Sequence, residues 1–171
     1  CGTMSVGKTT LVNALKKLPQ FDKYEFATER SQHLMSLGIP LNTDSTLKGQ
    51  TVFLAERCGE LMYDDIITDR TIIDVMAFTQ NAKSIPYQDK DKFIEYAKEF
   101  IREYDYIFYI SPDGLPIEDN GVRETDEHYR DVIDFTITSF IRKYAYMMKN
   151  IETIKGTTEE RIEQILNITS L

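Results

Sequence analysis

A segment near the start of the chain has the residue types that hold phosphate groups. Gly2-Thr3-Met4-Ser5-Val6-Gly7-Lys8-Thr9 matches the pattern G-x-x-x-x-G-K-[S/T] at every fixed position. Its small residues let the backbone curl so that N–H groups point at phosphate oxygens, Lys8 adds a positive charge, and the Thr9 hydroxyl suits Mg²⁺. The segment predicts a nucleoside triphosphate site, with a Gly-rich turn beside a surface lysine as the alternative. We assign nucleotide contacts to Gly2, Met4, Ser5, Val6, Gly7, Lys8, Thr9 and Thr10.

A helix has to follow this segment and direct its positive end at the same anion. Apolar residues recur at helical spacing after Lys8, so the sequence predicts a helix from about Gly7 to Lys17. Phosphate loops of this kind also follow a buried strand. We therefore expect a longer parent sequence, with the first strand of the sheet mostly missing from the residues printed here.

The rest of the chain reads as alternating strands and helices. Short apolar runs rich in β-branched and aromatic residues predict strands, at 24–28, 65–68, 106–110 and 151–154. Helical periodicity predicts helices, at 30–37, 47–62, 72–81, 89–103, 126–144 and 158–166. Asp44 or Ser45 is the expected N-cap of the helix over 47–62. Alternation of buried strands with helices favours a parallel α/β sheet covered on both faces.

Composition limits the compartment and the partners. The 171 residues favour a single domain over 1–171. An excess of 28 acidic over 20 basic residues, a net charge of −8, argues against general binding of nucleic acid or of an anionic membrane. No apolar run approaches the roughly 20 residues of a membrane span. Two cysteines, Cys1 and Cys58, do not make a disulfide framework, which favours a reduced, cytoplasmic protein.

Binding of a nucleotide does not fix the reaction. A GTPase would normally carry an Asn-Lys-x-Asp element and an Asp-x-x-Gly element, and the sequence contains neither. A motor ATPase usually ends the corresponding strand in Asp-Glu, where this chain has Asp69-Arg70.

The stretch from Thr68 to Phe78 reads Asp-Arg-x-x-x-Asp-x-x-Ala-aromatic after its first residue and resembles nucleoside and nucleotide kinases. Most of the chain resembles the small P-loop kinases grouped with ribosylnicotinamide kinases and the AAA-domain predicted kinases. Further matching pieces are Glu29-Arg30, Gly38–Asn42, Gln50 with Arg57, Gly121–Arg123 and Gly156–Arg161. The resemblance implies a three-layer P-loop NTPase fold of the α/β class, with a largely parallel five-stranded sheet in the order 2-3-1-4-5. It also implies a lid at about 113–130.

The resemblance assigns the reacting groups. Asp69 would share the Mg²⁺ ion with Thr9, unless it is the N-cap of the next helix. Arg70 would face the acceptor or the moving phosphoryl group; its alternative is an ion pair with Asp74. Glu29 would orient the acceptor hydroxyl or take its proton, although related kinases often place the acidic residue where this chain has Ala27, and a helix-start carboxylate is the alternative.

Other assignments concern the acceptor, the lid and the base of the donor. Acceptor contacts are assigned to Arg30, Gln50 and Asp74. The alternatives are that Arg30 only covers the edge of the sheet, that Gln50 lies on a polar helix surface, and that Asp74 only pairs with Arg70. Arg123 and Arg130 would close over the phosphates, against a solvated surface of paired charges. Gly156 would lie beside the adenine, against a plain strand-to-helix turn.

The sequence thus predicts a phosphotransferase that uses ATP and Mg²⁺ on a small nucleoside, nucleotide or nucleoside-like acceptor. The alternatives are a kinase of a nucleic-acid end or modified base and a non-catalytic regulatory module that binds a nucleoside triphosphate. The oligomeric state stays open, with a homodimer among the alternatives.

Overall fold

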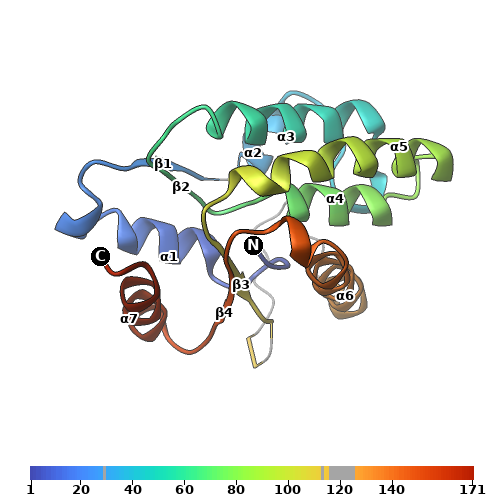
Figure 1. Ribbon diagram of the computed structural model, residues 1–171. Helices are drawn as coiled ribbons and strands as arrows, with labels where there is room; N and C mark the ends of the chain where they lie inside the picture. Colours follow the sequence, from blue (N-terminus) through green and yellow to red (C-terminus); the bar gives the residue numbers. More distant parts are fainter. Residues whose placement is uncertain (29, 113, 116–125) are drawn as a thin grey trace.

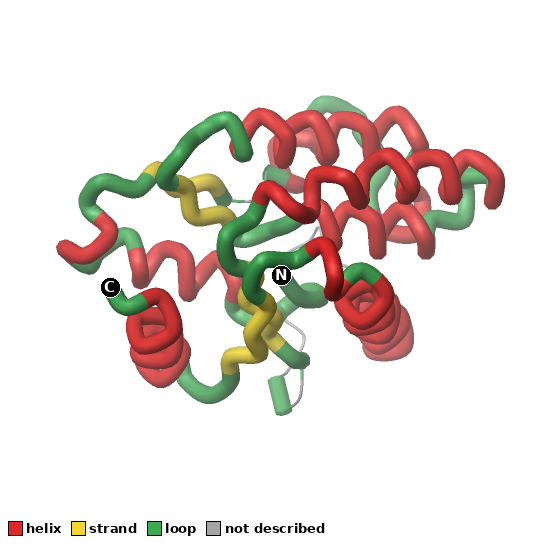
Figure 2. The backbone as a smooth tube through the Cα atoms, viewed as in Figure 1, coloured by secondary structure: helices red, strands yellow, loops and turns green. Residues whose placement is uncertain are grey.

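Helices cover both sides of short parallel strands (Figures 1 and 2). The computed structural model describes residues 1–28, 30–112, 114–115 and 126–171. One side carries α1 (Lys8–Leu15) and α7 (Thr158–Thr169). The other carries α3 (Leu47–Glu60), α4 (Ile72–Asn81), α5 (Tyr87–Ala97) and α6 (Glu127–Lys143). Shorter elements are α2 (Ser31–Ser36) and the 3₁₀ turns Pro19–Phe21, Asn42–Asp44, Lys98–Glu103 and Ala145–Met147.

The strands form two parallel pairs. In one, β1 (Glu25–Ala27) pairs with β2 (Ile66–Thr68); in the other, β3 (Ile107–Ile110) pairs with β4 (Ile151–Ile154). A cavity of about 310 Å³ lies between the pairs, lined by residues of both β2 and β3. The parallel α/β prediction is confirmed, whereas the five-stranded order 2-3-1-4-5 stays a prediction because the described residues pair only four strands.

The residue before the phosphate loop extends the second pair. The nitrogen of Cys1 donates to the carbonyl of Phe108 at 2.7 Å, and the nitrogen of Ile110 donates to the carbonyl of Cys1 at 3.1 Å. These bonds follow the parallel ladder pattern. They place the start of the loop against the carboxyl end of β3.

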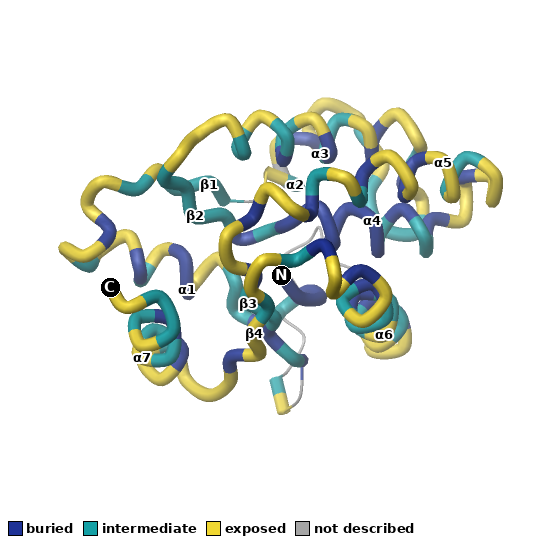
Figure 3. The backbone as a smooth tube through the Cα atoms, in the orientation of Figure 1, coloured by how far each residue is buried: buried dark blue, intermediate teal, exposed yellow. Residues whose placement is uncertain are grey.

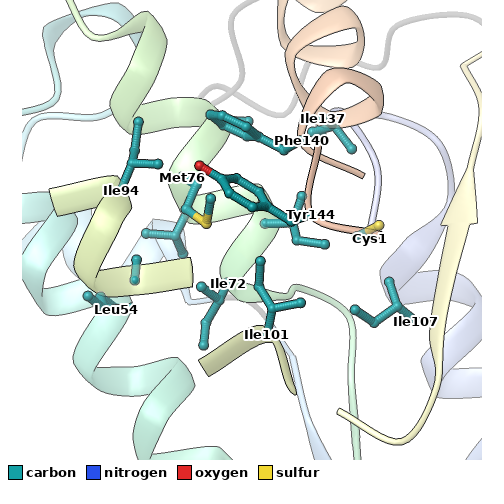
Figure 4. Packing of buried hydrophobic residues seen from close by; sticks show 14 of the residues in the cluster. Cys1, Leu54, Ile72, Met76, Ile94, Ile101, Ile107, Ile137, Phe140 and Tyr144 are labelled. Carbon is teal, nitrogen blue, oxygen red and sulfur yellow. The ribbon is translucent and has the colours of Figure 1, made fainter. Parts of the chain in front are cut away.

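The core lies mainly around α4, which Figure 3 shows buried along most of its length. Ile72, Ile73 and Met76 are fully buried there. Figure 4 shows Met76 beside the rings of Phe140 and Tyr144, whose centroids are 5.9 Å apart. A second apolar cluster packs α1 against α7 and the second strand pair through Val6, Leu11, Leu15, Phe21, Ile110, Ile154 and Ile165. These two clusters hold the phosphate loop between them.

Two local predictions are wrong. The N-cap of α3 is Thr46, whose hydroxyl accepts a hydrogen bond from Gly49 N at 3.1 Å, because Asn42–Asp44 forms its own 3₁₀ turn upstream. The helix predicted over 89–103 begins at Tyr87 and changes to a 3₁₀ turn after Ala97. The predicted bounds of α4 and β4 are confirmed without change.

Candidate phosphate-binding site

The loop from Gly2 to Thr9 turns through three residues with positive φ. These angles are 148° at Gly2, 60° at Ser5 and 81° at Gly7, and α1 begins at the next residue, Lys8. Alternation of such residues with ordinary ones turns consecutive N–H groups toward one concavity. A Cβ atom at Gly2 would lie 2.7 Å from the carbonyl oxygen of Ile110, so that position has no room for a side chain.

Lys8 crosses the concavity of the loop. Its Nζ donates to the carbonyl oxygens of Gly2 at 2.7 Å and Thr3 at 2.5 Å. The ammonium group therefore lies against the first residues of the loop although it belongs to the last. This is a position from which it can bind an anion held by the loop.

Thr9 and Asp69 meet beside the loop. Thr9 Oγ1 donates to Asp69 Oδ2 at 2.6 Å, and Asp69 is 3% exposed. Asp69 is not a helix cap, because the N-cap of α4 is Thr71. Mg²⁺ prefers oxygen ligands and usually keeps several waters beside one or two protein groups. The hydroxyl and carboxylate fit that ion, while the described residues hold no cluster of three or more His, Cys, Asp or Glu ligands.

Asp74 ties the start of α4 to the phosphate loop. Its Oδ1 accepts from Gly2 N at 3.0 Å, and its Oδ2 accepts from the backbone and hydroxyl of Thr71 at 2.7 and 2.9 Å. Burial raises the pKa of the Asp74 carboxyl, but nearby positive charges, Lys8 and Arg70 among them, and the Gly2 bond outweigh it and hold the pKa below its ordinary value. The T-x-x-D spacing of Thr71 and Asp74 is that of a capping box and could have indicated the bond between these two residues.

Arg70 lies between the loop and α4. Its Nη1 is 4.0 Å from Asp74 Oδ1, and its guanidinium carbon is 5.3 Å from the centre of the Phe78 ring. The side chain is 16% exposed and lines the same cavity as the loop. The guanidinium is thus held in place by a ring and a carboxylate at the edge of the phosphate site.

A cavity of about 250 Å³ opens over the loop and α1. It brings together the predicted residues Met4 to Thr10, Arg70 and Gly156. It also contains Thr157 and Thr158, from the turn that the resemblance to kinases indicates, and two residues to which sequence reasoning assigned no individual role, Leu115 and Arg161. Arg161 reaches the loop from α7, and its Nη1 donates to the carbonyl of Val6 at 2.8 Å.

Arg130 does not line this cavity but contacts Leu115, which does. Its Nη1 donates to the carbonyl of Leu115 at 2.7 Å, and its own carbonyl accepts from Thr3 Oγ1 at 3.2 Å. Glu29, Arg123 and most of the lid, 113 and 116–125, lie outside the described residues, so those assignments stay predictions.

The remaining acceptor residues lie toward α3. The Arg30 side chain is 57% exposed, with Nη1 3.9 Å from Glu56 Oε1. Gln50 is 3% exposed and Arg57 is 1% exposed, and both lie on the buried side of α3. The buried position of Gln50 does not agree with the alternative of a polar helix surface. The roles of Arg30 and Gln50 toward an acceptor stay predictions.

One arginine on α3 faces two glutamates. Arg57 Nη2 is 2.5 Å from Glu60 Oε1 and 3.9 Å from Glu56 Oε2, and the Oε2 atoms of both glutamates are buried without a hydrogen bond from the described residues. Burial raises the pKa of Glu60 to about 7; Arg57 opposes this shift, and the charges of Glu56 and Asp69 add to it. Burial is therefore the main reason why Glu60 keeps its proton to a higher pH than an exposed glutamate does.

Comparison with known proteins places this arrangement among P-loop folds. A sequence profile described as "AAA domain" matches residues 1–161. A structure of deoxyadenosine kinase from M. mycoides, with products dCMP and a flexible dCDP bound, superposes with a TM-score of 0.71 at 18% identity, covering 99% of this chain and 96% of that one. The dCTP-bound structure of the same kinase gives a TM-score of 0.69 at 19% identity, and the dATP-bound structure gives 0.65 at 18% identity. Each match covers 99% of this chain and 97% of the matched chain.

Other comparisons add less. No curated protein sequence matches the chain significantly. Along the part of the chain that the structure describes, no helix combines the length and apolar character needed to cross a membrane. The family profile and the superposed structures show the fold of this chain, which is that of an α/β P-loop NTPase.

Proposed function

This chain belongs to the AAA-domain family, and we propose that it transfers the γ-phosphoryl group of ATP, with Mg²⁺, to a small nucleoside, nucleotide or nucleoside-like acceptor. The observation that carries the proposal is the 2.6 Å hydrogen bond from Thr9 to Asp69 beside the 250 Å³ cavity of the loop. It joins a hydroxyl at the helix start to a carboxylate after β2, which is the oxygen pair expected for nucleotide-bound Mg²⁺.

The donor would occupy the cavity over α1. Its phosphates would meet the loop N–H groups, the positive end of α1 and Lys8, which already lies across the loop at 2.7 Å from the Gly2 carbonyl. Mg²⁺ supplies charge neutralisation on the donor phosphates when bound. The turn after β4, with Gly156 and Thr157, lines the other end of the cavity and would receive the base.

Arg70 would act on the transferring group. The acceptor oxygen attacks the γ-phosphorus, the bond to the β–γ bridging oxygen breaks, and ADP leaves with the negative charge. Arg70 lines the cavity and is oriented by Phe78 and Asp74, so its guanidinium can stabilise charge on the moving oxygens. The hydroxyl proton passes to a carboxylate, which the sequence assigns to Glu29.

The nucleoside class of the acceptor rests on two supports. Gln50 lies on the buried side of α3, where its amide group can donate to and accept from the edge of a base. The matched deoxyadenosine kinase structures contain deoxynucleotides, although their low identity supports the fold rather than the substrate.

The test is ADP release with ATP and Mg²⁺ across nucleosides, deoxynucleosides, their monophosphates and nicotinamide riboside. We expect one acceptor to stimulate release well above background and EDTA to abolish it. A flat panel with ATP still bound would overturn the small-molecule kinase. A salt-sensitive response to oligonucleotides would then favour the nucleic-acid kinase, and no response the regulatory module.

Two variants test the site itself. Lys8→Ala should lower the transfer rate on the order of 100-fold or more, whereas Lys17→Ala, an exposed lysine just after α1, should keep wild-type activity. Arg70→Ala should lower kcat without changing the KM for ATP. Arg102→Ala removes an exposed arginine paired with Glu99 at 3.3 Å and is its matched control.

A further inference from the structure

Arg161 joins the last helix of the chain to the phosphate loop. It is the fourth residue of α7 and is 6% exposed, so little of its side chain contacts water. Nη1 donates to the carbonyl of Val6 at 2.8 Å across 155 residues of sequence. Nε is also buried and makes no hydrogen bond with the described residues. Burying a cation costs free energy, so we expect this arginine to have a function in its contact with the phosphate loop.

The bonded carbonyl belongs to the peptide between Val6 and Gly7. In a planar trans peptide, the C=O and N–H groups point in opposite directions. Because the Val6 carbonyl points at Arg161 on α7, the Gly7 N–H is directed to the other side of the same peptide. Gly7 is the N-cap residue of α1, where backbone N–H groups are the natural partners of an anion.

The contact is close as well as directional. A Cβ atom at Gly7 would lie 3.3 Å from Arg161 Nη1, so the guanidinium packs directly on the glycine. Gly7 has a φ of 81°, which favours glycine for a second reason. A peptide next to a glycine with positive φ can rotate readily unless something holds its carbonyl.

We propose that Arg161 is a positioning residue that fixes the Val6–Gly7 peptide, so that the Gly7 N–H faces the donor phosphates before the nucleotide arrives. The proposal deepens the proposed function and rests on the loop being the donor phosphate site. Arg161 then acts through the loop backbone, and its effect is independent of the base of the nucleotide.

Inorganic tripolyphosphate separates this role from a contact with the base. Wild type and Arg161→Gln are titrated with tripolyphosphate and with ATP, with the Gly7 amide followed by NMR in ¹⁵N-glycine-labelled protein. We expect the variant to bind both ligands more weakly by the same factor, on the order of tenfold, and to show a displaced Gly7 amide signal without ligand. In turnover, the KM for ATP rises and the KM for the acceptor stays.

The matched control is Gln164→Ala on the same helix. Gln164 Nε2 donates to the carbonyl of Lys155 at 2.8 Å, so its loss loosens the turn before α7 without touching the loop. We expect it to keep wild-type affinity for tripolyphosphate. Equal weakening in both variants would mean that Arg161 acts only through the stability of α7, and the proposal would be wrong.

Other outcomes overturn specific claims. Unchanged tripolyphosphate affinity in Arg161→Gln overturns the positioning role and leaves the proposed function standing; weaker ATP binding alone would indicate a base contact instead. Tripolyphosphate binding could weaken in Arg161→Gln but not in Gln164→Ala, while the wild type phosphorylates no acceptor. That result would support the role of Arg161 and overturn the proposed kinase activity. A wild type that binds neither ligand overturns both.

Discussion

Replacing Glu60 by glutamine should change the stability of the protein in a pH-dependent way. The Glu60 side chain is 16% exposed, and its Oε2 is buried without a hydrogen bond from the described residues. Glutamine keeps the shape of the side chain, and its carbonyl oxygen can still accept the hydrogen bond from Arg57 Nη2. The substitution therefore removes one ionisation and little else.

The magnitude follows from the two pKa values. The pKa of Glu60 is about 7 in the folded protein, chiefly because of burial, against an ordinary value of 4.5. Between these pH values the folded state binds more protons than the unfolded state, so the free energy of unfolding falls as pH rises. Well above pH 7, the ionisation of Glu60 lowers the free energy of unfolding by about 3 kcal/mol in total. At about pH 4.5 and below it is absent.

Urea unfolding of wild type and Glu60→Gln over the range from about pH 5 to about pH 8 isolates this contribution, because every other ionisation cancels in the difference. We expect the variant to gain on wild type as pH rises, reaching about 3 kcal/mol at about pH 8. Glu95→Gln is the control without a pH trend in this range: the hydrogen bond from Lys98 lowers the pKa of exposed Glu95, so this carboxyl is ionised in both the folded and the unfolded state. A difference that stays constant with pH would refute the reasoning for Glu60.

Three further substitutions test the packing and capping described above. Ile137→Ala removes a fully buried side chain and should lower the free energy of unfolding by about 3 kcal/mol in urea titrations, whereas Phe135→Ala, 68% exposed on the same helix, should change it by less than about 0.5 kcal/mol. Thr157→Ala removes the N-cap hydroxyl of α7 and should cost about 1 kcal/mol in the same assay; an unchanged midpoint would discount the cap. Asp74→Asn should cost about 2 kcal/mol, because the amide nitrogen that replaces one carboxylate oxygen can accept neither the N–H of Gly2 nor that of Thr71; wild-type stability would contradict that geometry.

Much of the fold follows from local sequence signals. The apolar run that forms α4 and the run that forms β4 have the predicted bounds. α4 is buried along most of its length, whereas the middle of β4 is exposed and its β-branched residues mark the strand. The N-cap of α3 was misassigned because Asp44, Ser45 and Thr46 are all capping residues, and the preceding 3₁₀ turn decides between them. Periodicity also could not place the change from α5 to a 3₁₀ turn, because both helix types continue the same apolar side.

Some contacts of the candidate site could also be predicted from the sequence, and others could not. The phosphate loop is contiguous, so its pattern is visible in the sequence, and the resemblance to small P-loop kinases paired Asp69 with Thr9. Arg161 could not be found, because its partner is a backbone carbonyl and any residue type supplies one. The bond from Gly2 to Asp74 depends on where α4 meets the loop, which only the folded chain specifies, whereas the bond from Thr71 to Asp74 is local.

The parallel strand pairs have a consequence for the order of folding. Glu25 pairs with Ile66 and Ile107 pairs with Ile151, so each ladder must close a long stretch of chain before its first hydrogen bond forms. The loop gains its contact from Arg161 only after the last helix has docked. Chains with such non-local contacts fold slowly, and their helices can form ahead of their sheets. We therefore expect the ability to bind a triphosphate to return last during refolding, after most of the helical signal has recovered.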